Sequence, residues 1–269
     1  MKISILSTEA KHHKFAANLF AQGLKRHNQS FDSVTHGNIK ECDLLIGWGY
    51  SSIHRVKKFC KDFLMMEAAY LQPRVDDNYW PLNISLGYNG LNGYADFLKY
   101  GKDSSRWEKH YNDGRLKDWK KEGEYILVTG QMLSDWSVKH LKINYSSIVH
   151  EIEKHLKLPV IFKPHPRGGS GNVPGKTSSE PLTTLLKNAK AVVTVNSNSG
   201  VDSILEGVPV LALDRGSMCW DICMKNYIDL FNITYPERNT WLHELSWCQW
   251  FYDEISSGEA WEHLKSKYE

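Results

Sequence analysis

The feature that most constrains the fold lies in residues 125–213, where short apolar runs alternate with amphipathic segments. The uninterrupted apolar runs predict buried strands, and the segments between them have helical spacing. A strand without polar alternation is buried on both faces, which requires a parallel sheet covered by helices. We therefore predict a Rossmann-like unit with strands at 125–129, 158–163, 191–195 and 208–213 and helices at 138–156, 182–188 and 199–206.

The first hundred residues predict a second Rossmann-like pattern. Apolar runs at 2–6, 43–48 and 63–67 indicate strands, and residues 15–26 and 54–63 indicate helices. The stretch 79–97 is rich in Gly, Asn and aromatic residues, so we expect a structured loop there.

A polar, charged segment at 99–123 separates the two patterns and predicts a linker or a solvated helix. We place an N-terminal domain at residues 1–120 and a C-terminal domain at 121–269. The aromatic-rich residues 220–269 are predicted to form a helical tail on the second domain. Core packing is the expected fate of this tail, while a position between the domains and a partner contact remain alternatives.

Charge and cysteine content exclude several classes of protein. The formal charge of +2 lacks the strongly basic character of a dedicated nucleic-acid binder but leaves room for a local basic groove. The five cysteines have no paired spacing, which disfavours a disulfide framework and a zinc ribbon. Neither a membrane-spanning run nor a signal peptide is apparent, so we expect a cytoplasmic protein.

Polar groups follow each strand of the second half, at 129–131, 163–167, 196–200 and 214–216. The carboxyl ends of parallel strands meet at one edge of the sheet, where open α/β folds bind their ligands. We therefore expect these four groups to converge.

The segment after the third strand predicts a capped short helix. Ser199 stands at the expected N-cap with Asp202 three residues later, and Gly207 ends the helix. Together with Ser197 and Asn198, this helix start suits a phosphate or diphosphate. The structural alternative is an ordinary capped helix.

Residues 163–167 read Lys-Pro-His-Pro-Arg, and the two prolines stiffen the exit from a strand. A histidine held between two cations at this position favours binding of an anionic ligand, although a structural histidine is the alternative. The glycine-rich run that follows predicts a mobile loop, and it lacks P-loop spacing.

Four motifs carry a resemblance that spans residues 67–213. The sequence resembles the capsule-polysaccharide-synthesis glycosyltransferases, including Kdo transferases, which are a GT-B-like group. Residues 87–93 are also similar to small glycosyltransferase-like proteins of bacteriophages, some of them encoded beside DNA-base modification genes. The motifs are Glu67–Leu71 with Pro73-Arg74, Gly130-Gln131 with Asp135-Trp136-Ser137, Lys163–Pro166, and Asn196–Gly200 with Glu206–Val210.

The resemblance implies an α/β, GT-B-like fold with two Rossmann-like domains whose parallel sheets face each other across a cleft. It assigns the acceptor to the first domain and the nucleotide sugar to the second. Glu206 would contact the nucleoside, and Glu67 and Asp135 are the implied catalytic carboxylates. Ala68 departs from the acidic residue often found at that position in the family. The remaining implied contacts are with the donor (Gln131, Lys163, His165, Arg167, Ser197, Asn198, Ser199, Gly200) and the acceptor (Arg74, Asn89, Asn92).

Glycosyl transfer builds negative charge on the leaving phosphate and positive charge at the anomeric carbon, so it needs both cations and a carboxylate. Asp135 can serve as general base or as nucleophile, or it can simply cap a helix that begins near Trp136. No DxD-type metal motif follows a strand of the first half, so we expect no metal and no cofactor besides the nucleotide-sugar donor.

For the acceptor, the sequence favours a hydroxymethylated pyrimidine in phage-type DNA, with the protein then in the host cytoplasm. Tryptophans and basic residues at 106–121 suit a groove that grips phosphates and supports an everted base. The alternatives are a capsule or lipopolysaccharide sugar transferase of the Kdo type and a noncatalytic DNA- or carbohydrate-binding protein on the same frame. The sequence does not indicate an oligomeric state.

Overall fold

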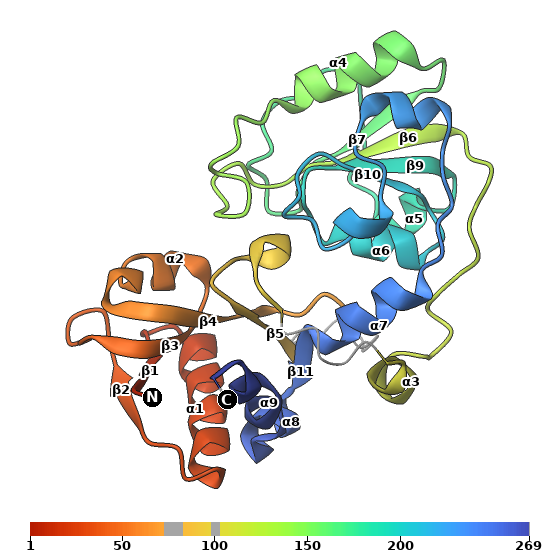
Figure 1. The fold of residues 1–269 in the computed structure, drawn as a ribbon. Helices are drawn as coiled ribbons and strands as arrows, with labels where there is room; N and C mark the ends of the chain where they lie inside the picture. The colour runs from red at the N-terminus through yellow and green to blue at the C-terminus, as the bar shows by residue number, and fades with distance from the viewer. Residues whose placement is uncertain (73–82, 98–102, 269) are drawn as a thin grey trace. The chain divides into compact units, whose positions relative to one another are not determined.

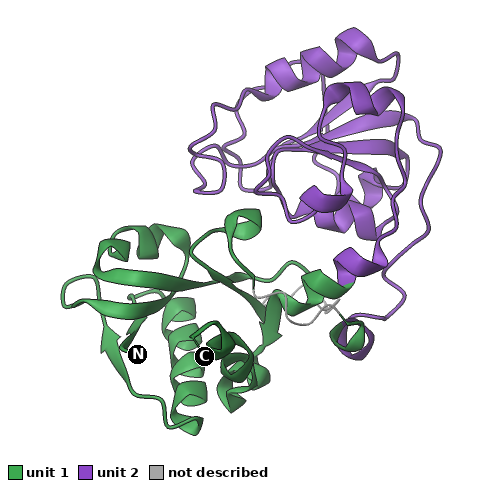
Figure 2. Cartoon of the chain, viewed as in Figure 1, with its two compact units in different colours: residues 1–106, 243–269 green, residues 107–242 purple. Residues whose placement is uncertain are grey.

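The computed structural model describes residues 1–72, 83–97 and 103–268, which form two compact units (Figures 1 and 2). Unit 1 comprises residues 1–106 and 243–269, and unit 2 comprises residues 107–242. The chain thus passes from unit 1 to unit 2 within helix α3 (Ser105–His110) and returns within α7 (Asn239–Trp247).

Unit 1 contains, within its described residues, a six-stranded mixed sheet in the order β11-β5-β4-β3-β1-β2. The four strands on one side are parallel, and the other two join antiparallel. The parallel strands are β1 (Ile3–Leu6), β2 (Phe31–Val34), β3 (Cys42–Trp48) and β4 (Cys60–Ala68), and the antiparallel ones are β5 (Asn83–Tyr88) and β11 (Gln249–Phe251).

The helices α1 (Lys11–Arg26), α8 (Tyr252–Ser257) and α9 (Glu259–Leu264) pack together over this sheet (Figure 1). Their contact is close because Gly23 has no side chain: a Cβ there would lie 2.2 Å from the carbonyl oxygen of Ile255. Phe20 of α1 and Trp261 of α9 meet edge to face in the same core. The shorter helices of unit 1 are α2 (Tyr50–His54), η1 (Lys57–Phe59), η2 (Asn92–Tyr94) and η5 (Lys265–Tyr268).

Unit 2 contains, in its described part, a parallel sheet in the order β10-β9-β6-β7-β8. Its central strands are buried on both faces, as their unbroken apolar runs require. The strands are β6 (Tyr125–Thr129), β7 (Val160–Lys163), β8 (Lys176–Thr177), β9 (Ala189–Thr194) and β10 (Val210–Ala212). The helices are α4 (Tyr145–His155), α5 (Leu182–Leu185), α6 (Ser199–Leu205), η3 (Trp220–Ile222) and η4 (Tyr227–Phe231).

The predicted α/β class with two Rossmann-like patterns is confirmed, but the boundary differs from the prediction. The switch between units falls at Arg106/Trp107 instead of residue 120, and residues 243–269 belong to unit 1 instead of unit 2. Arg106 shows why the tail returns. Its guanidinium donates two hydrogen bonds of 2.8 Å to the carboxylate of Glu254, and both side chains are about 95% buried.

Three local expectations were wrong. Residues 83–88 form a buried strand instead of a loop, because the glycine at position 87 leaves room for Ala95 and Phe97 against the sheet. The predicted helix at 54–63 is replaced by α2, a single 3₁₀ turn and the first half of β4. The helix predicted at 138–156 begins later than expected. Helix α4 starts at Tyr145, and Asn144 caps it by accepting a hydrogen bond from the backbone N–H of Ser147.

No helix among residues 1–72, 83–97 and 103–268 has the length and apolar character needed to cross a membrane.

Candidate functional site

The carboxyl edge of the sheet in unit 2 brings together the four polar groups that the sequence singled out. The backbone N–H of Gly130, after β6, donates to the carbonyl of Lys163 at the end of β7 (2.8 Å). The hydroxyls of Thr129 and Ser199 lie 2.8 Å apart and join the end of β6 to the start of α6. The predicted convergence is confirmed.

A buried amide and carboxylate network ties the edge together. Gln131 and Asn196 exchange two hydrogen bonds, and the Asn196 side chain also donates to Asp214 (2.7 Å) and to the carbonyl of Ser137. Asp214 in turn accepts from the backbone N–H of Gly216. Gln131 therefore stabilises the edge and is not an open contact for the nucleotide-sugar donor.

Sequence reasoning placed Asn196 and Asp214 among the edge groups but did not choose either as a site residue. The sequence signal was available, since each of these residues closely follows a strand. In the structure both side chains are more than 90% buried. A buried polar side chain at the end of a parallel strand requires partners, and these are its neighbours along the edge.

His165 is held in one tautomer by its own loop. Its Nδ1 accepts from the backbone N–H of Arg167 (3.1 Å), which leaves the proton on Nε2. Burial lowers the pKa of His165, the charge of Arg167 lowers it further, and Asp135 opposes the shift. At neutral pH this imidazole is therefore uncharged and offers one N–H donor beside the exposed guanidinium of Arg167.

The glycine-rich loop after His165 is anchored by two hydrogen bonds at its ends. The buried hydroxyl of Ser170 accepts from the backbone N–H of His165, and the carbonyl of Gly169 accepts from Leu133 (both 3.0 Å). Gly168, Gly169 and Gly171 all have positive φ near 80°, a conformation that favours glycine. The loop thus has a defined shape beside the β6 connection.

The start of α6 differs in detail from the predicted cap. Asn198 is the N-cap and makes no side-chain cap bond, while the hydroxyl of Ser197 accepts from the backbone N–H of Ser199 (3.2 Å). Ser197, Asn198 and Ser199 nevertheless stand together at the carboxyl edge, with Gly200 buried behind them. The predicted stop is confirmed: Gly207, with φ of 77°, ends the helix.

Two predicted donor residues have other partners. Glu206 lies at the opposite end of α6 from Ser199 and forms an ion pair with Lys117, so it is separated from the edge by the length of the helix. The ammonium of Lys163 donates to the carbonyl of Glu180 (2.6 Å), in the segment that follows β8.

Asp135 is exposed in the loop after β6 and caps a turn. One carboxylate oxygen accepts from both the backbone N–H (2.8 Å) and the hydroxyl (2.7 Å) of Ser137. No helix begins at Trp136. Asp135 does have the capping role that was the alternative, but it caps a turn instead of a helix. Its effect on the pKa of His165 shows that the two groups interact electrostatically.

Glu67 belongs to unit 1, near the carboxyl end of β4, and is half-buried. Its Oε1 oxygen is 3.7 Å from the position that a Cβ on Gly49 would take, and the backbone of Gly49 is bonded to Met66. The carboxylate therefore lies next to the end of β3.

The three predicted acceptor residues have different surroundings. Arg74 lies outside the described residues. Asn89 has a positive φ and uses its amide group to bind the backbone of Phe63 and the carboxylate of Asp62, which is a structural turn. Asn92, also at positive φ, accepts from the hydroxyl of Tyr70 (3.1 Å).

The basic, tryptophan-rich segment at 106–121 is occupied by internal contacts. Trp107 is buried, and the indole of Trp119 donates to Pro236 while Arg238 stacks on its ring. Lys117 pairs with Glu206, and Lys120 donates to a backbone carbonyl. Lys109 and Lys121 are exposed, so the segment keeps surface cations, while Trp107 is buried and Trp119 is covered by Arg238.

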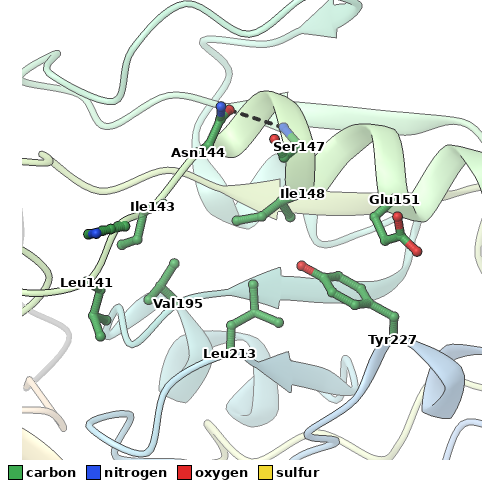
Figure 3. A pocket seen from close by; sticks show the side chains of 10 residues that line it. Leu141, Ile143, Asn144, Ser147, Ile148, Glu151, Val195, Leu213 and Tyr227 are labelled. Atoms are coloured by element: carbon green, nitrogen blue, oxygen red, sulfur yellow. Dashed lines mark hydrogen bonds between the residues drawn. The ribbon is translucent and has the colours of Figure 1, made fainter.

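Beside the edge of unit 2 lies a hollow of about 530 Å³ between α4, the end of β9 and the segment after β10 (Figure 3). Val195 and Leu213, which immediately precede Asn196 and Asp214, form its floor, and Tyr227 and Glu151 stand at its border. None of the predicted donor residues lines it. Among the described residues, no group of three or more His, Cys, Asp or Glu side chains is placed to hold a metal ion.

No protein-family model and no curated protein sequence matches the chain. Among solved structures, it is similar to Thermosulfurimonas dismutans KpsC, described as a β-Kdo 2,7-transferase, with a TM-score of 0.59, 13% identity and coverage of 100% of both chains. A second KpsC structure from that organism, a β-Kdo 2,4-transferase, gives a TM-score of 0.61 at 13% identity over 93% of this chain and 92% of the other. The likeness shows the fold, and it confirms the predicted GT-B-like class. The phage DNA-modification link stays a prediction.

Proposed function

We propose that this protein is a glycosyltransferase that moves a sugar from a nucleotide-sugar donor to a hydroxyl group of a glycan. The observation that carries the proposal is the convergence, at one edge of unit 2, of a neutral His165, Arg167 and the Ser197–Ser199 group. Likeness to two Kdo transferases supports a donor of the Kdo type. All further assignments follow from what the transfer reaction requires.

The leaving group of such a reaction is a phosphate that gains negative charge as the glycosidic bond breaks. The Nε2–H of His165 and the guanidinium of Arg167 supply donors for that charge, and hydroxyls of Ser197 and Ser199 add short polar groups beside them. The network of Gln131, Asn196 and Asp214 joins the loops after β6, β9 and β10. Backbone bonds from Gly130 to Lys163 and from Leu133 to Gly169 join the loop after β7 to the loop after β6. Unit 2 is thus assigned the donor.

For the proton of the attacking hydroxyl we assign Glu67 as general base. Its carboxylate stands near a strand end in unit 1. Asp135 already accepts two hydrogen bonds on one oxygen. We therefore assign it a supporting role, in which its negative charge acts on His165.

A glycan acceptor is favoured over duplex DNA by the internal contacts of the two tryptophans in the 106–121 segment. The groove that the sequence suggested would need exposed aromatic rings and unpaired cations. Trp107 and Trp119 instead pack internally, and Lys117 is paired. A salt-dependent mobility shift with hydroxymethylated duplex DNA tests the point, because specific retention would restore DNA as the acceptor.

The first experiment is a thermal-shift measurement on the full chain with CMP, UDP and GDP. A ligand at 100 times its Kd raises the unfolding free energy by about 2.7 kcal/mol, so one nucleotide is expected to raise Tm by several degrees. The rise should shrink in Arg167→Ala and persist in His150→Gln, a control on the exposed face of α4. If none of the three nucleotides raises Tm, the noncatalytic alternative replaces the proposal.

Sugar transfer itself is followed with CMP-, UDP- and GDP-sugars and a glycan mixture, by phosphorus NMR of the released nucleotide. Glu67→Gln should abolish transfer while leaving the thermal shift intact, because the base acts after donor binding. Asp135→Asn should lower the rate to a lesser degree. Unchanged transfer in both variants would end the catalytic assignments.

A further inference from the structure

Two cysteines of unit 2 lie beside the proposed donor edge and take no part in the proposed reaction. Cys219 and Cys223 stand at the two ends of the single 3₁₀ turn η3, as its N-cap and its C-cap. Their side chains are hydrogen-bonded to each other, and Cys223 also donates to the carbonyl of Trp220 (3.4 Å). Both are free thiols, of which Cys219 is fully buried and Cys223 is partly exposed. We call these two residues the cysteine pair.

The two thiols differ in acidity, which separates their roles. The hydrogen bond from Cys219 lowers the pKa of Cys223, burial opposes this shift, and the charge of Lys225 lowers the pKa further. The hydrogen bond to Cys223 and burial together raise the pKa of Cys219 well above its ordinary value. Cys223 is therefore the thiol that ionises first and attacks, while Cys219 remains protonated beside it.

Cys223 also borders a space that admits a small reagent. It lines a hollow of about 460 Å³ together with Lys225 and Asp229, a volume typical of pockets for small ligands. The carboxylate of Asp229 accepts from the backbone N–H groups of Lys225 and Asn226. The ammonium of Lys225 is exposed, so it can attract the carboxylates of a peptide such as glutathione.

The sulfur of Cys219 supports the start of helix α6 from behind. A Cβ on Gly200 would lie 2.9 Å from this sulfur, so the thiol and the glycine pack directly together. The sulfur is also 3.1 Å from the hydroxyl of Ser217, whose backbone N–H donates to the carbonyl of Asp214. It thus joins the loop after β10 to the residue that follows the Ser197–Ser199 group.

We infer that the cysteine pair is a site of reversible oxidation by a low-molecular-weight disulfide of the glutathione type, and that the resulting Cys219–Cys223 disulfide weakens the packing at the start of α6. The thiolate of Cys223 attacks one sulfur of the reagent, whose S–S bond breaks, and the first thiol leaves with the proton that Cys223 lost. Cys219 then attacks the sulfur of Cys223 and gives its proton to the second departing thiol. Two protein thiols are oxidised, and one reagent disulfide is reduced to two thiols.

The disulfide acts on α6 through the position of one atom. A covalent S–S bond is shorter than a thiol–thiol hydrogen bond, so its formation draws the sulfur of Cys219 toward Cys223. The sulfur then loses contact with Gly200 and Ser217, and the helix start loses packing on that side. A lower affinity for the nucleotide follows only if the proposed function is correct, whereas the weaker packing of α6 does not depend on it.

The first measurement locates the disulfide. The full chain is incubated with oxidised glutathione, its remaining thiols are blocked with N-ethylmaleimide, and it is digested with trypsin. Residues 216–225 form one tryptic peptide that contains both cysteines of the pair and no other cysteine. We expect this peptide to lose two hydrogen atoms, to carry neither maleimide nor glutathione, and to accept maleimide again after dithiothreitol. A peptide that stays fully labelled with maleimide overturns the inference.

Single variants separate the attacking thiol from the displacing thiol. In Cys219→Ser the glutathione adduct on Cys223 should accumulate, because no second thiol displaces it. In Cys223→Ser neither an adduct nor a disulfide should form at Cys219. Cys60→Ser is the matched control, since Cys60 is also partly exposed but burial raises its pKa to about 11, and its peptide 216–225 should react as in wild type. An adduct on Cys219 in Cys223→Ser, or no adduct in Cys219→Ser, would contradict the assigned roles.

Hydrogen exchange tests the effect on α6 without any nucleotide. Backbone amides of residues 200–203 should exchange about tenfold faster in the oxidised protein than in the reduced protein, because local opening is easier when packing is lost. Amides of α1, in unit 1, are the reference and should exchange equally in both forms. Equal exchange at 200–203 in the two forms would overturn the link between the cysteine pair and α6.

Thermal shifts with CMP, UDP and GDP then distinguish this inference from the proposed function. Oxidation should reduce the nucleotide-dependent rise in Tm in wild type and leave it unchanged in Cys223→Ser. A chain that forms the disulfide and exchanges faster at α6 but binds no nucleotide keeps the inference and loses the proposed function. A chain that binds a nucleotide and forms no disulfide does the reverse.

Discussion

The side-chain amide of Gln131 and the residue Asn196 form a closed pair across two strand ends. Nε2 of Gln131 donates to Oδ1 of Asn196 (2.8 Å), and the backbone N–H of Asn196 donates to Oε1 of Gln131 (3.1 Å). Gln131 follows β6 and Asn196 follows β9, which are neighbours in the sheet. The pair therefore fixes the loop that carries Ser197 and Ser199 relative to the loop that carries Asp135.

Asn196→Ala should lower the free energy of unfolding by about 2–3 kcal/mol, because it leaves the amide of Gln131 and the carboxylate of Asp214 buried with fewer partners. Urea unfolding measures the change. The control is Asn188→Ala, an exposed asparagine with a single 3.4 Å bond to Glu124, for which a change within about 0.5 kcal/mol is expected. Equal losses in both variants would contradict a structural role for the pair.

His165→Ala should reduce kcat/KM for donor consumption about 10²-fold, since it removes a donor to the leaving phosphate. His165→Gln, which keeps an N–H group, should recover part of the loss. Because the pKa of His165 is lowered, the imidazole is already neutral at pH 7, and the ratio of wild-type to His165→Ala rates should stay constant from pH 7 to 9. A ratio that falls steadily over this range would show that the imidazolium is the active form.

Arg106→Ala should destabilise unit 1 by about 3–5 kcal/mol, because it leaves the carboxylate of Glu254 buried without its cation. Lys61→Ala is the matched control: Lys61 pairs with Asp43 on the surface, where solvent screens the ion pair and its loss should change stability little. Chemical denaturation monitored by tryptophan fluorescence compares the two. Similar small effects would mean that the Arg106 pair does not hold the tail.

The stability of unit 1 should fall as pH is lowered from 6.5 to 4. Burial and the neighbouring His12 and His36 lower the pKa of His13 to about 4, whereas the unfolded chain has the ordinary value near 6.5. Between these values the unfolded state binds more protons, so acid favours unfolding. Tm measured at pH 7, 6 and 5 should fall less in His13→Gln than in wild type or in His150→Gln. Parallel curves for all three would contradict the assignment.

The sequence predicted the edge of unit 2 well because each of its strands is marked by a local pattern of residues. An unbroken apolar run marks the strand, and the polar residues directly after it mark the edge, as for Thr129 and His165. The rule did not select Glu206, which the resemblance assigned to the nucleoside. Its position at the far end of α6 follows from the seven helical residues between it and Asn198.

Other features depend on contacts that no local pattern records. The strand at 83–88 contains Asn83 and Gly87, both poor local evidence for a buried strand, and it is stabilised by pairing with β4 and β11. The return of residues 243–269 to unit 1 depends on Arg106, which lies more than a hundred positions earlier in the chain. The basic segment at 106–121 had the composition of a groove, but Trp107 and Trp119 make internal contacts that the composition does not reveal.

The double crossing of the chain between its units has a consequence during synthesis. Unit 2 is one continuous stretch, so its core is complete once residue 242 has emerged from the ribosome. Unit 1 at that moment lacks β11, α8 and α9, so α1 packs on β1 and β3 but its face toward α8 and α9 is uncovered. The half of the protein made first is therefore the half that matures last, and its exposed helix is where a chaperone would be needed.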